Sequence, residues 1–147
     1  MKSNDILFSI LISIFLIFFI KIFLFSPVII KGNSMSSTFN DGDISFFIPT
    51  KTYSIFKILL NDKDYSFLKD KNVIVEHKNK KIIKRCVGIP FDTLLFFDNY
   101  GNEKKIIVPQ DSFFVIGDNF RNSYDSRSFG FIGLKEIKGI IVFEKKL

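Results

Sequence analysis

The sequence predicts a mainly antiparallel, barrel-like all-β domain preceded by one N-terminal transmembrane α-helix. Two observations support this fold class: a long apolar segment near the N-terminus, and a series of short apolar runs separated by turn residues over the rest of the chain. The 147 residues correspond to about one domain. A hydrophobic share of 47% excludes a disordered chain, because disordered chains lack the apolar surface that offsets chain entropy.

The apolar segment covers residues 6–25 and contains only three polar residues, Ser9, Ser13 and Lys21. Twenty helical residues span about 30 Å, the thickness of a hydrocarbon core. The two serines cost little there, because a helical serine can donate to the carbonyl four residues earlier. Pro27 then ends the helix, because it lacks the N–H that the next turn needs.

A cleaved signal peptide is the competing interpretation of this segment. Its apolar stretch is shorter and ends at a small-x-small site, whereas the bulky residues 23–25 precede Pro27 here. The sequence therefore favours an uncleaved anchor. We expect residues 1–26 to form a cytoplasmic tip and a transmembrane anchor, and residues 27–147 to form an extracytoplasmic β-rich domain.

The remainder alternates between short apolar runs and turn signals, which is typical of an all-β domain. Residues 50–72 stay open between helix, hairpin and loop. The expected strands are residues 44–48, 73–75, 81–87, 93–97, 105–108, 113–116 and 139–143.

Composition excludes several classes of site. Cys86 is the only cysteine and His77 the only histidine, which excludes a disulfide scaffold and argues against a Cys/His zinc cluster. The net charge of +6 indicates an anionic membrane surface, nucleic acid, or simply a solvated lysine face.

Three local patterns combine residues that can perform chemistry. They read G-N-S-M-S-S-T-F at 32–39, I-I-K-R-C-V-G-I-P at 82–90 and G-D-N-F-R-N-S-Y-D-S-R at 117–127. Each alone has an ordinary structural interpretation, as a loop serine, a solvated lysine and a polar turn with an ion pair. Their order behind an apolar segment is more specific.

Together the three patterns resemble the type I signal peptidases, membrane-bound serine/lysine peptidases that carry S-M-x-P-T-L, K-R-V-x-G-x-P and G-D-N-R-x-N-S-x-D-S-R. The resemblance covers residues 26–147. It implies the signal-peptidase fold and a serine endopeptidase that removes signal peptides from secreted precursors after small residues. It also implies a single-pass protein of the plasma (inner) membrane that binds precursors and the lipid bilayer, but no nucleic acid, metal or cofactor.

The resemblance also implies roles for individual residues. Ser34 would be the nucleophile and Lys84 its general base, with Ser123 hydrogen-bonded to Lys84. Asp125 would pair with Arg127 and Arg85, while Asp118 and Asn119 would shape the turn. The Ser34 backbone N–H would be one oxyanion donor, and Gly32 occupies the position of the second. The implied substrate pocket comprises Ile30, Met35, Phe39, Ile82 and Ile83, although core packing explains these residues equally well.

A lysine general base must be neutral, which requires a pKa well below the usual value of about 10.4. Burial can supply that shift. On a strand, Lys84 shares its face with Ile82 and Cys86 while Arg85 points the other way, so an apolar environment for the amine is available. We expect Cys86 itself to be a buried, inert thiol.

The chain departs from the family pattern near both catalytic segments. Ser37 replaces the proline that would preset the backbone after the nucleophile, and Phe39 replaces leucine. Phe120 stands where arginine usually follows G-D-N, and Gly32 replaces a serine found in many members.

Other functions remain open at this point. A conjugation-type processing peptidase of the same superfamily would keep the fold and the serine/lysine pair. A non-catalytic anchored β domain would keep the fold alone. A catalytic triad around His77 is disfavoured, because no motif surrounds this residue.

Overall fold

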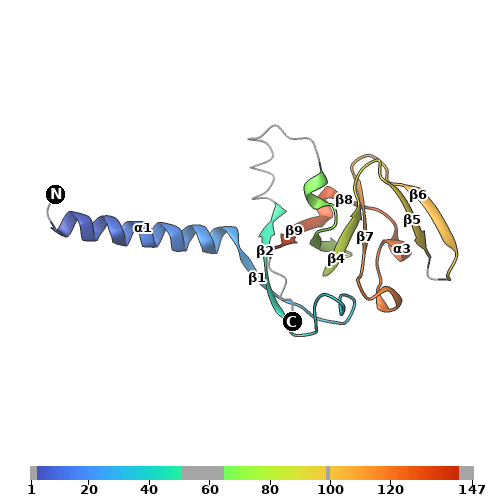
Figure 1. Ribbon diagram of the computed structural model, residues 1–147, viewed down its shortest axis with the longest axis horizontal. Helices are drawn as coiled ribbons and strands as arrows, with labels where there is room; N and C mark the ends of the chain where they lie inside the picture. The colour runs from blue at the N-terminus through green and yellow to red at the C-terminus, as the bar shows by residue number, and fades with distance from the viewer. Residues whose placement is uncertain (1–2, 51–64, 99, 143–147) are drawn as a thin grey trace.

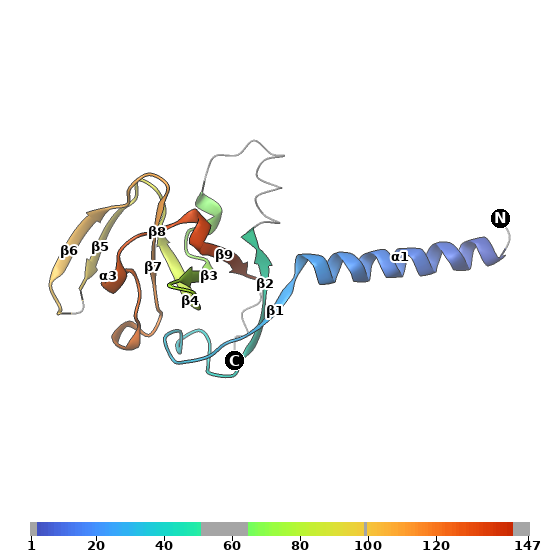
Figure 2. The ribbon, with the colours of Figure 1, turned by 180° about the vertical axis from the view of Figure 1, so that it is seen from behind.

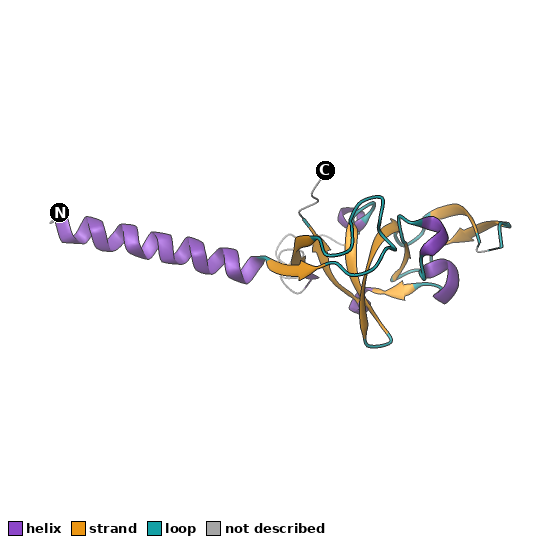
Figure 3. Cartoon of the chain, turned by 90° about the horizontal axis from the view of Figure 1, so that it is seen from below, coloured by secondary structure: helices purple, strands orange, loops and turns teal. Residues whose placement is uncertain are grey.

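An N-terminal helix and a β-rich domain make up the structure, a computed structural model that describes residues 3–50, 65–98 and 100–142. Helix α1 (Ser3–Leu24) extends away from the strands and leads into β1 (Figures 1 and 3). Ser9 Oγ donates to the Asp5 carbonyl at 2.8 Å and Ser13 Oγ to the Ser9 carbonyl at 2.9 Å, which confirms that both hydroxyls are satisfied within the helix. Within the described part of the chain, no helix combines the length and the apolar character that a membrane crossing requires.

The β domain consists of short strands joined by turns and single helical turns. The strands are β1 (Ser26–Ile29), β2 (Ile44–Pro49), β3 (Asn72–His77), β4 (Lys80–Gly88), β5 (Thr93–Phe97), β6 (Glu103–Ile107), β7 (Ser112–Ile116), β8 (Ile132–Gly133) and β9 (Ile137–Ile141). The helical turns are η1 (Ser66–Leu68), η2 (Phe120–Asn122), α3 (Ser126–Phe129) and η3 (Leu134–Glu136).

Seven strands form one sheet in the order β1-β2-β9-β3-β4-β7-β8, and β5 pairs with β6 in a separate hairpin. The pairings between described strands are antiparallel, which confirms the predicted mainly antiparallel β class. Among the described strands no ladder joins β1 to β8, so the sheet is not closed into a barrel by these pairings and β1 has one edge without a described strand partner. The β5–β6 hairpin lies at the end of the domain opposite α1 (Figures 1 and 2).

Each of the seven predicted strands is present, with ends that differ by a few residues. The sequence missed β1 and β8, because β1 is a four-residue strand containing Pro27 and β8 has two residues. Of the ambiguous segment at 50–72, residues 51–64 lie outside the described residues. The described remainder contains η1 and the start of β3.

Two buried clusters fill the domain. The larger contains Leu68, Val73, Val75, Cys86, Phe113, Val115, Ile132, Ile137 and Ile140. The smaller lies beside the loop that follows β1 and contains Ile30, Met35, Phe39, Ile74 and Ile141. Since Met35 and Phe39 follow Ser34 closely in the chain, the smaller cluster anchors the segment that carries this serine.

Candidate active site

The structure brings Ser34 and Lys84 together. Lys84 Nζ donates a hydrogen bond of 2.7 Å to Ser34 Oγ. Ser34 lies in the loop after β1, where the N–H groups of Thr38 and Phe39 both donate to the Met35 carbonyl and close a helical turn. Lys84 lies in the middle of β4, paired with Val73 of β3. A loop residue and a strand residue therefore meet beside the smaller cluster, which holds Met35 of the loop and against which Ile83 of β4 packs.

Burial gives the Lys84 amine the property that a general base needs. The residue is 2% exposed. Burial lowers the pKa of Lys84 below its usual value; the Asp125 and Asp118 carboxylates oppose this shift, while the Arg127 charge adds to it. The neutral amine, which can accept a proton, is therefore populated at lower pH than for an exposed lysine.

The predicted alternation along β4 is confirmed. Lys84 and Cys86 are buried, whereas Arg85 between them is partly exposed on the other face. Burial raises the pKa of the Cys86 thiol to about 12, so the reactive thiolate is scarce at neutral pH. The expectation of a buried Cys86 is confirmed.

Arg85 pairs with Asp118, and the expected contact between Arg85 and Asp125 is wrong. Arg85 donates to both Asp118 oxygens, from Nε at 2.8 Å and from Nη2 at 2.7 Å. Thr38 Oγ1 also donates to Asp118 and accepts from Arg85 Nη2 at 3.2 Å. Burial raises the pKa of Asp118, but the hydrogen bonds from Arg85 and Thr38 outweigh it and hold the pKa below its usual range. Thr38 thereby links the serine loop to the lysine strand, a role that the sequence interpretation missed.

Asp125 and Arg127 form the buried ion pair that the resemblance implied. Arg127 donates from Nε at 2.9 Å and from Nη2 at 2.7 Å, and the two side chains are 1% and 0% exposed. The Asp125 carboxylate also accepts from the Gly117 N–H at 2.9 Å and from the Arg127 N–H at 3.2 Å, which caps α3. Phe120 covers the pair, with its ring centroid 3.8 Å from the Arg127 guanidinium carbon.

Ser123 does not make the expected hydrogen bond to Lys84. Its Oγ is buried and has no hydrogen-bond partner among the described residues, although it lies near enough to Asp125 to help lower the pKa of that carboxyl. Ser123 packs against Gly117, while the Lys84 amine points to Ser34. Ser123 therefore lies next to the site, but it makes no hydrogen bond to the Lys84 amine in this arrangement.

Asn119 holds the serine loop in place. Its backbone N–H donates to the Ser34 carbonyl at 2.9 Å, and its Nδ2 donates to the Asn33 carbonyl at 2.9 Å and to Ser36 Oγ at 3.0 Å. These bonds span the loop on both sides of Ser34. They fasten the segment in which Ser37 stands in place of a rigid proline.

The two positions expected to supply oxyanion donors differ in whether their N–H groups are already hydrogen-bonded. Within the described part of the chain, the Ser34 N–H has no acceptor and is free to bind a substrate oxygen. Gly32 has no hydroxyl, and its N–H donates to Asp41 Oδ1 at 2.6 Å. Gly32 therefore does not supply the second donor in this arrangement.

His77 lies away from this site. It is four residues further along β3 than Val73, the partner of Lys84. Its Nδ1 lies 3.4 Å from Glu136 Oε1, and its ring stacks on Phe129 at 4.4 Å between centroids. Among the residues that the structure describes, no group of three His, Cys, Asp or Glu side chains is placed to hold a metal ion.

Comparison with known proteins identifies the family. The sequence matches the family described as "Signal peptidase, peptidase S26" over residues 3–99 and 94–144. The chain belongs to this family. It is 31% identical over 173 residues to signal peptidase I P of Bacillus subtilis subsp. natto, covering 95% of this chain and 88% of that protein. It is 30% identical over 164 residues to signal peptidase I of Bacillus amyloliquefaciens, covering 92% and 83%.

A crystal structure of a signal peptidase I from Enterococcus faecalis V583 aligns with a TM-score of 0.43 at 20% identity, covering 50% of this chain and 95% of that chain. The matches over most of the sequence assign signal peptidase I activity to the chain, and with it the hydrolysis of peptide bonds by a serine peptidase. The non-catalytic alternative is thereby set aside.

A groove of about 1040 Å³ lies beside Ser34. Four of the five residues expected in a substrate pocket line it, namely Ile30, Met35, Ile82 and Ile83. Phe39 does not, and this part of the prediction is wrong: its side chain is 1% exposed and turned into the smaller core cluster. Met35 and Phe39 both pack in this cluster, but only Met35 also reaches the groove, so proximity to Ser34 in the chain was insufficient to place Phe39.

Gly117 packs so closely against Ser123 and the Ser34 carbonyl that an added methyl group should displace them. A Cβ at this position would overlap Ser123 Oγ and lie 2.6 Å from both Ser123 Cβ and the Ser34 carbonyl oxygen. We expect Gly117→Ala to lower kcat for precursor cleavage by about 100-fold or more, because small displacements of a nucleophile have effects of that size. Steady-state cleavage kinetics measure the change.

Gly133→Ala provides the matched control. A Cβ there would meet only Glu136 Oε2, at 3.9 Å, which is an ordinary contact. We expect this variant to retain its activity. Equal kinetics for the two glycine variants would contradict the close packing of Gly117 against the Ser34 loop.

Proposed function

We propose that Ser34 and Lys84 are the catalytic pair of this signal peptidase and that it cleaves precursors after small residues. The observation that carries the proposal is the 2.7 Å contact between Lys84 Nζ and Ser34 Oγ, made by an amine that is almost fully buried. Peptide hydrolysis by a serine requires a base within hydrogen-bond reach of the hydroxyl, in its neutral form. Lys84 lies within that reach, and burial lowers its pKa and so favours the neutral form.

The proposed reaction proceeds through an acyl-enzyme. The neutral Lys84 amine takes the Ser34 proton as Ser34 Oγ attacks the carbonyl carbon before the cleavage site. The Ser34 N–H stabilises the oxyanion that forms. The Lys84 ammonium then gives its proton to the departing amine of the substrate. The Lys84 amine, neutral again, activates the water that hydrolyses the ester formed with Ser34.

The strands around the groove suit an extended peptide. Among the described strands, β1 has one unpaired edge, and β4 pairs with β7 only from Arg85 onward, so the first residues of β4 have no described strand partner on that side. A precursor segment lying between these edges can form main-chain hydrogen bonds to both, with its side chains in the groove. Ile30, Met35, Ile82 and Ile83 make the lining apolar and leave room for small residues near Ser34.

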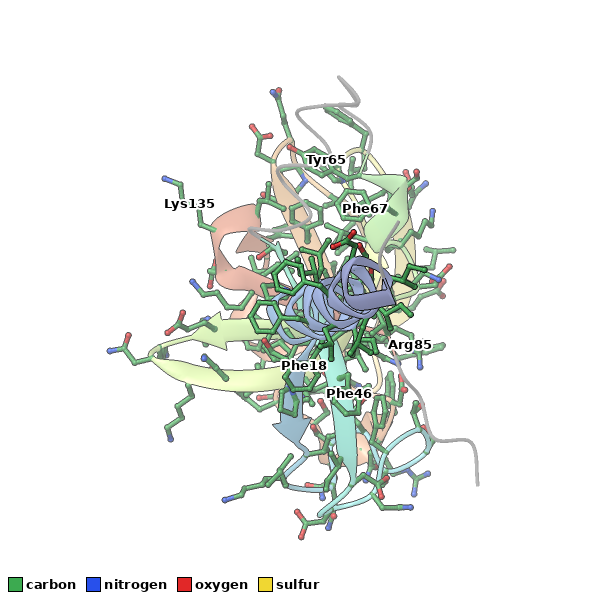
Figure 4. The ribbon with its side chains drawn as sticks, turned by 90° about the vertical axis from the view of Figure 1, so that its left-hand side faces the viewer. Phe18, Phe46, Tyr65, Phe67, Arg85 and Lys135 are labelled. Atoms are coloured by element: carbon green, nitrogen blue, oxygen red, sulfur yellow. The ribbon has the colours of Figure 1, made fainter. Side chains whose placement is uncertain are left out.

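We also propose that residues 1–26 are an uncleaved anchor in the plasma membrane and that residues 27–147 form the catalytic domain on its extracytoplasmic side. Two features support the anchor: the apolar run at 6–25, and the exposure of the large apolar side chains of α1 between Ile6 and Phe18, which need an apolar environment. Figure 4, which looks along α1, shows how the β domain spreads around the end of this helix. Anchoring enzyme and precursor in one membrane raises their effective concentration, so weak peptide affinity suffices.

A cleavage assay tests the proposal. The full chain in neutral detergent micelles is given a precursor with alanine at the first and third positions before the cut, and a second precursor with leucine at the first. We expect cleavage after alanine and a kcat/KM lower by about 100-fold for leucine, because a filled pocket resists a larger side chain. Equal cleavage of the two precursors would contradict a site selective for small residues.

A further inference from the structure

Charged side chains form part of the groove lining. Five charged residues line the groove: Lys31, Lys81, Lys135, Lys138 and Glu76. Glu76 is thus the single acidic residue among the described residues of the lining. The groove carries an excess of positive charge.

Glu76 forms an ion pair with Lys138, and the charge of Lys81 also acts on it. Lys138 Nζ lies 2.8 Å from Glu76 Oε2 and also donates to the Lys135 carbonyl at 3.0 Å. In the described part of the chain, Lys31, Lys81 and Lys135 have no carboxylate partner. Lys31 lies three residues before Ser34 in the chain, whereas Lys81 lies on β4 and Lys135 on η3. The side chains of Lys81 and Lys135 are exposed, and Figure 4 shows that of Lys135 extending outward from the ribbon.

These lysines lie close to one another. Lys81 is directly opposite Glu76 in the β3–β4 pairing, and Glu76 is bound to Lys138, which contacts Lys135. Lys81 precedes Lys84 by three residues on β4, a distance of about 10 Å along a strand. A peptide that lies along β4 with its cleavage site at Ser34 therefore reaches Lys81 about three to five residues away from the cut.

We propose that the precursor segment before the cut runs over the start of β4, and that Lys81 and Lys135 make this signal peptidase selective for precursors with an acidic side chain at the fourth to sixth position before the cleavage site. This inference rests on the proposed function, because it uses the same peptide path along the groove. Two unpaired ammonium groups beside an apolar groove attract a carboxylate and repel a cation. Since the groups lie away from the reacting atoms, they act on binding and not on the chemical step.

Peptides that differ at one position test the inference. They carry alanine at the first and third positions before the cut and Glu, Gln or Lys at the fifth, and the full chain is assayed in neutral detergent micelles. We expect kcat/KM to follow Glu, then Gln, then Lys, with about tenfold between Glu and Lys at low salt, since two exposed ion pairs have effects of this order. The difference should appear in KM and shrink at about 1 M NaCl.

Substitution of Lys81 and Lys135 tests whether these lysines cause the preference for the Glu peptide. The double variant Lys81→Gln and Lys135→Gln should cleave the three peptides at similar rates and keep wild-type kcat on the Gln peptide. Lys105→Gln, an exposed lysine on the β5–β6 hairpin at the opposite end of the domain, should keep the full preference.

Other outcomes would overturn the inference in distinguishable ways. Equal cleavage of the Glu, Gln and Lys peptides would leave the peptidase intact and remove the charge selectivity. A lysine effect seen only on vesicles containing anionic phosphatidylglycerol, and absent in neutral micelles, would show that the lysines bind lipid headgroups instead. If no peptide is cleaved, the proposed function fails, and the inference falls with it.

Discussion

Replacement of Lys84 by methionine should abolish precursor cleavage while leaving the fold intact. Methionine has a similar length and fills the buried site, but it cannot take the Ser34 proton. We expect kcat to fall by about 10³-fold to 10⁴-fold or more, with a similar loss for Ser34→Ala, because members of a catalytic pair act as one unit. Cleavage kinetics of the full chain in micelles measure both losses.

Loss of stability does not account for this expected result. A lysine whose pKa is lowered by burial destabilises the folded state when it is protonated, because the unfolded chain binds that proton more tightly. The folded state is therefore penalised below the ordinary lysine pKa, and the penalty grows as the pH falls towards the lowered value. Lys84→Met removes the buried charge, so this variant should be at least as stable as the wild type at neutral pH.

Lys84→Arg separates charge from basicity. Arginine retains a positive charge but stays protonated at any accessible pH, so it cannot act as the base. We expect this variant to be as inactive as Lys84→Met. His77→Asn, a change remote from Ser34, should keep the wild-type rate. Cleavage that survives both Ser34→Ala and Lys84→Met, or that disappears with His77→Asn, would contradict the Ser34–Lys84 pair.

The Lys84 amine should also determine the pH dependence of the wild-type enzyme. Only neutral Lys84 accepts the proton, so the rate should rise with pH through the lowered pKa of this residue. The acid limb of the profile should therefore lie below the usual range of a free lysine. A limb at the ordinary lysine value would show that burial does not tune this group.

Removal of the Asp125 charge should produce the largest loss of stability. In Asp125→Asn, the Arg127 guanidinium remains buried without a counter-charge, and the Gly117 N–H and the cap of α3 lose a charged acceptor. Breaking a buried pair on one side costs about 3–5 kcal/mol. Urea unfolding of the full chain in micelles, followed by circular dichroism, measures the change in the free energy of unfolding.

An exposed pair provides the matched control. Lys69 and Asp92 lie 3.0 Å apart with 46% and 22% of their side chains exposed, so Lys69→Gln should cost less than about 1 kcal/mol. Equal losses for Asp125→Asn and Lys69→Gln would contradict the structural role of the buried pair.

The Asp125 contribution should also depend on pH in a defined direction. Burial raises the pKa of Asp125, but hydrogen bonds from Arg127 and the Gly117 N–H outweigh it and hold the pKa below its usual value. The stabilisation is therefore present above the usual carboxyl pKa and is lost as the pH falls through the lowered one. The difference in unfolding free energy between wild type and Asp125→Asn should shrink in acid.

Features that depend on local periodicity were predictable. The two-residue period of a strand places Lys84 and Cys86 on one buried face, and the structure confirms this alternation. The apolar runs between turn residues located seven strands. Which arginine pairs with which aspartate was harder to predict. The segment at 117–127 contains two carboxylates, and both Arg85 and Arg127 are candidate partners for them.

The sequence by itself determined the β class, the family and the pair of residues that we propose as catalytic, because strand periodicity and short motifs are local properties of the chain. The tertiary structure decided that Arg85 binds Asp118 and that Ser123 packs on Gly117 without bonding to Lys84. It also directed Phe39 into the core and left Lys81 and Lys135 unpaired beside the groove. Hydrogen bonds and ion pairs act over a few ångströms, so such contacts depend on how segments distant in sequence are brought together.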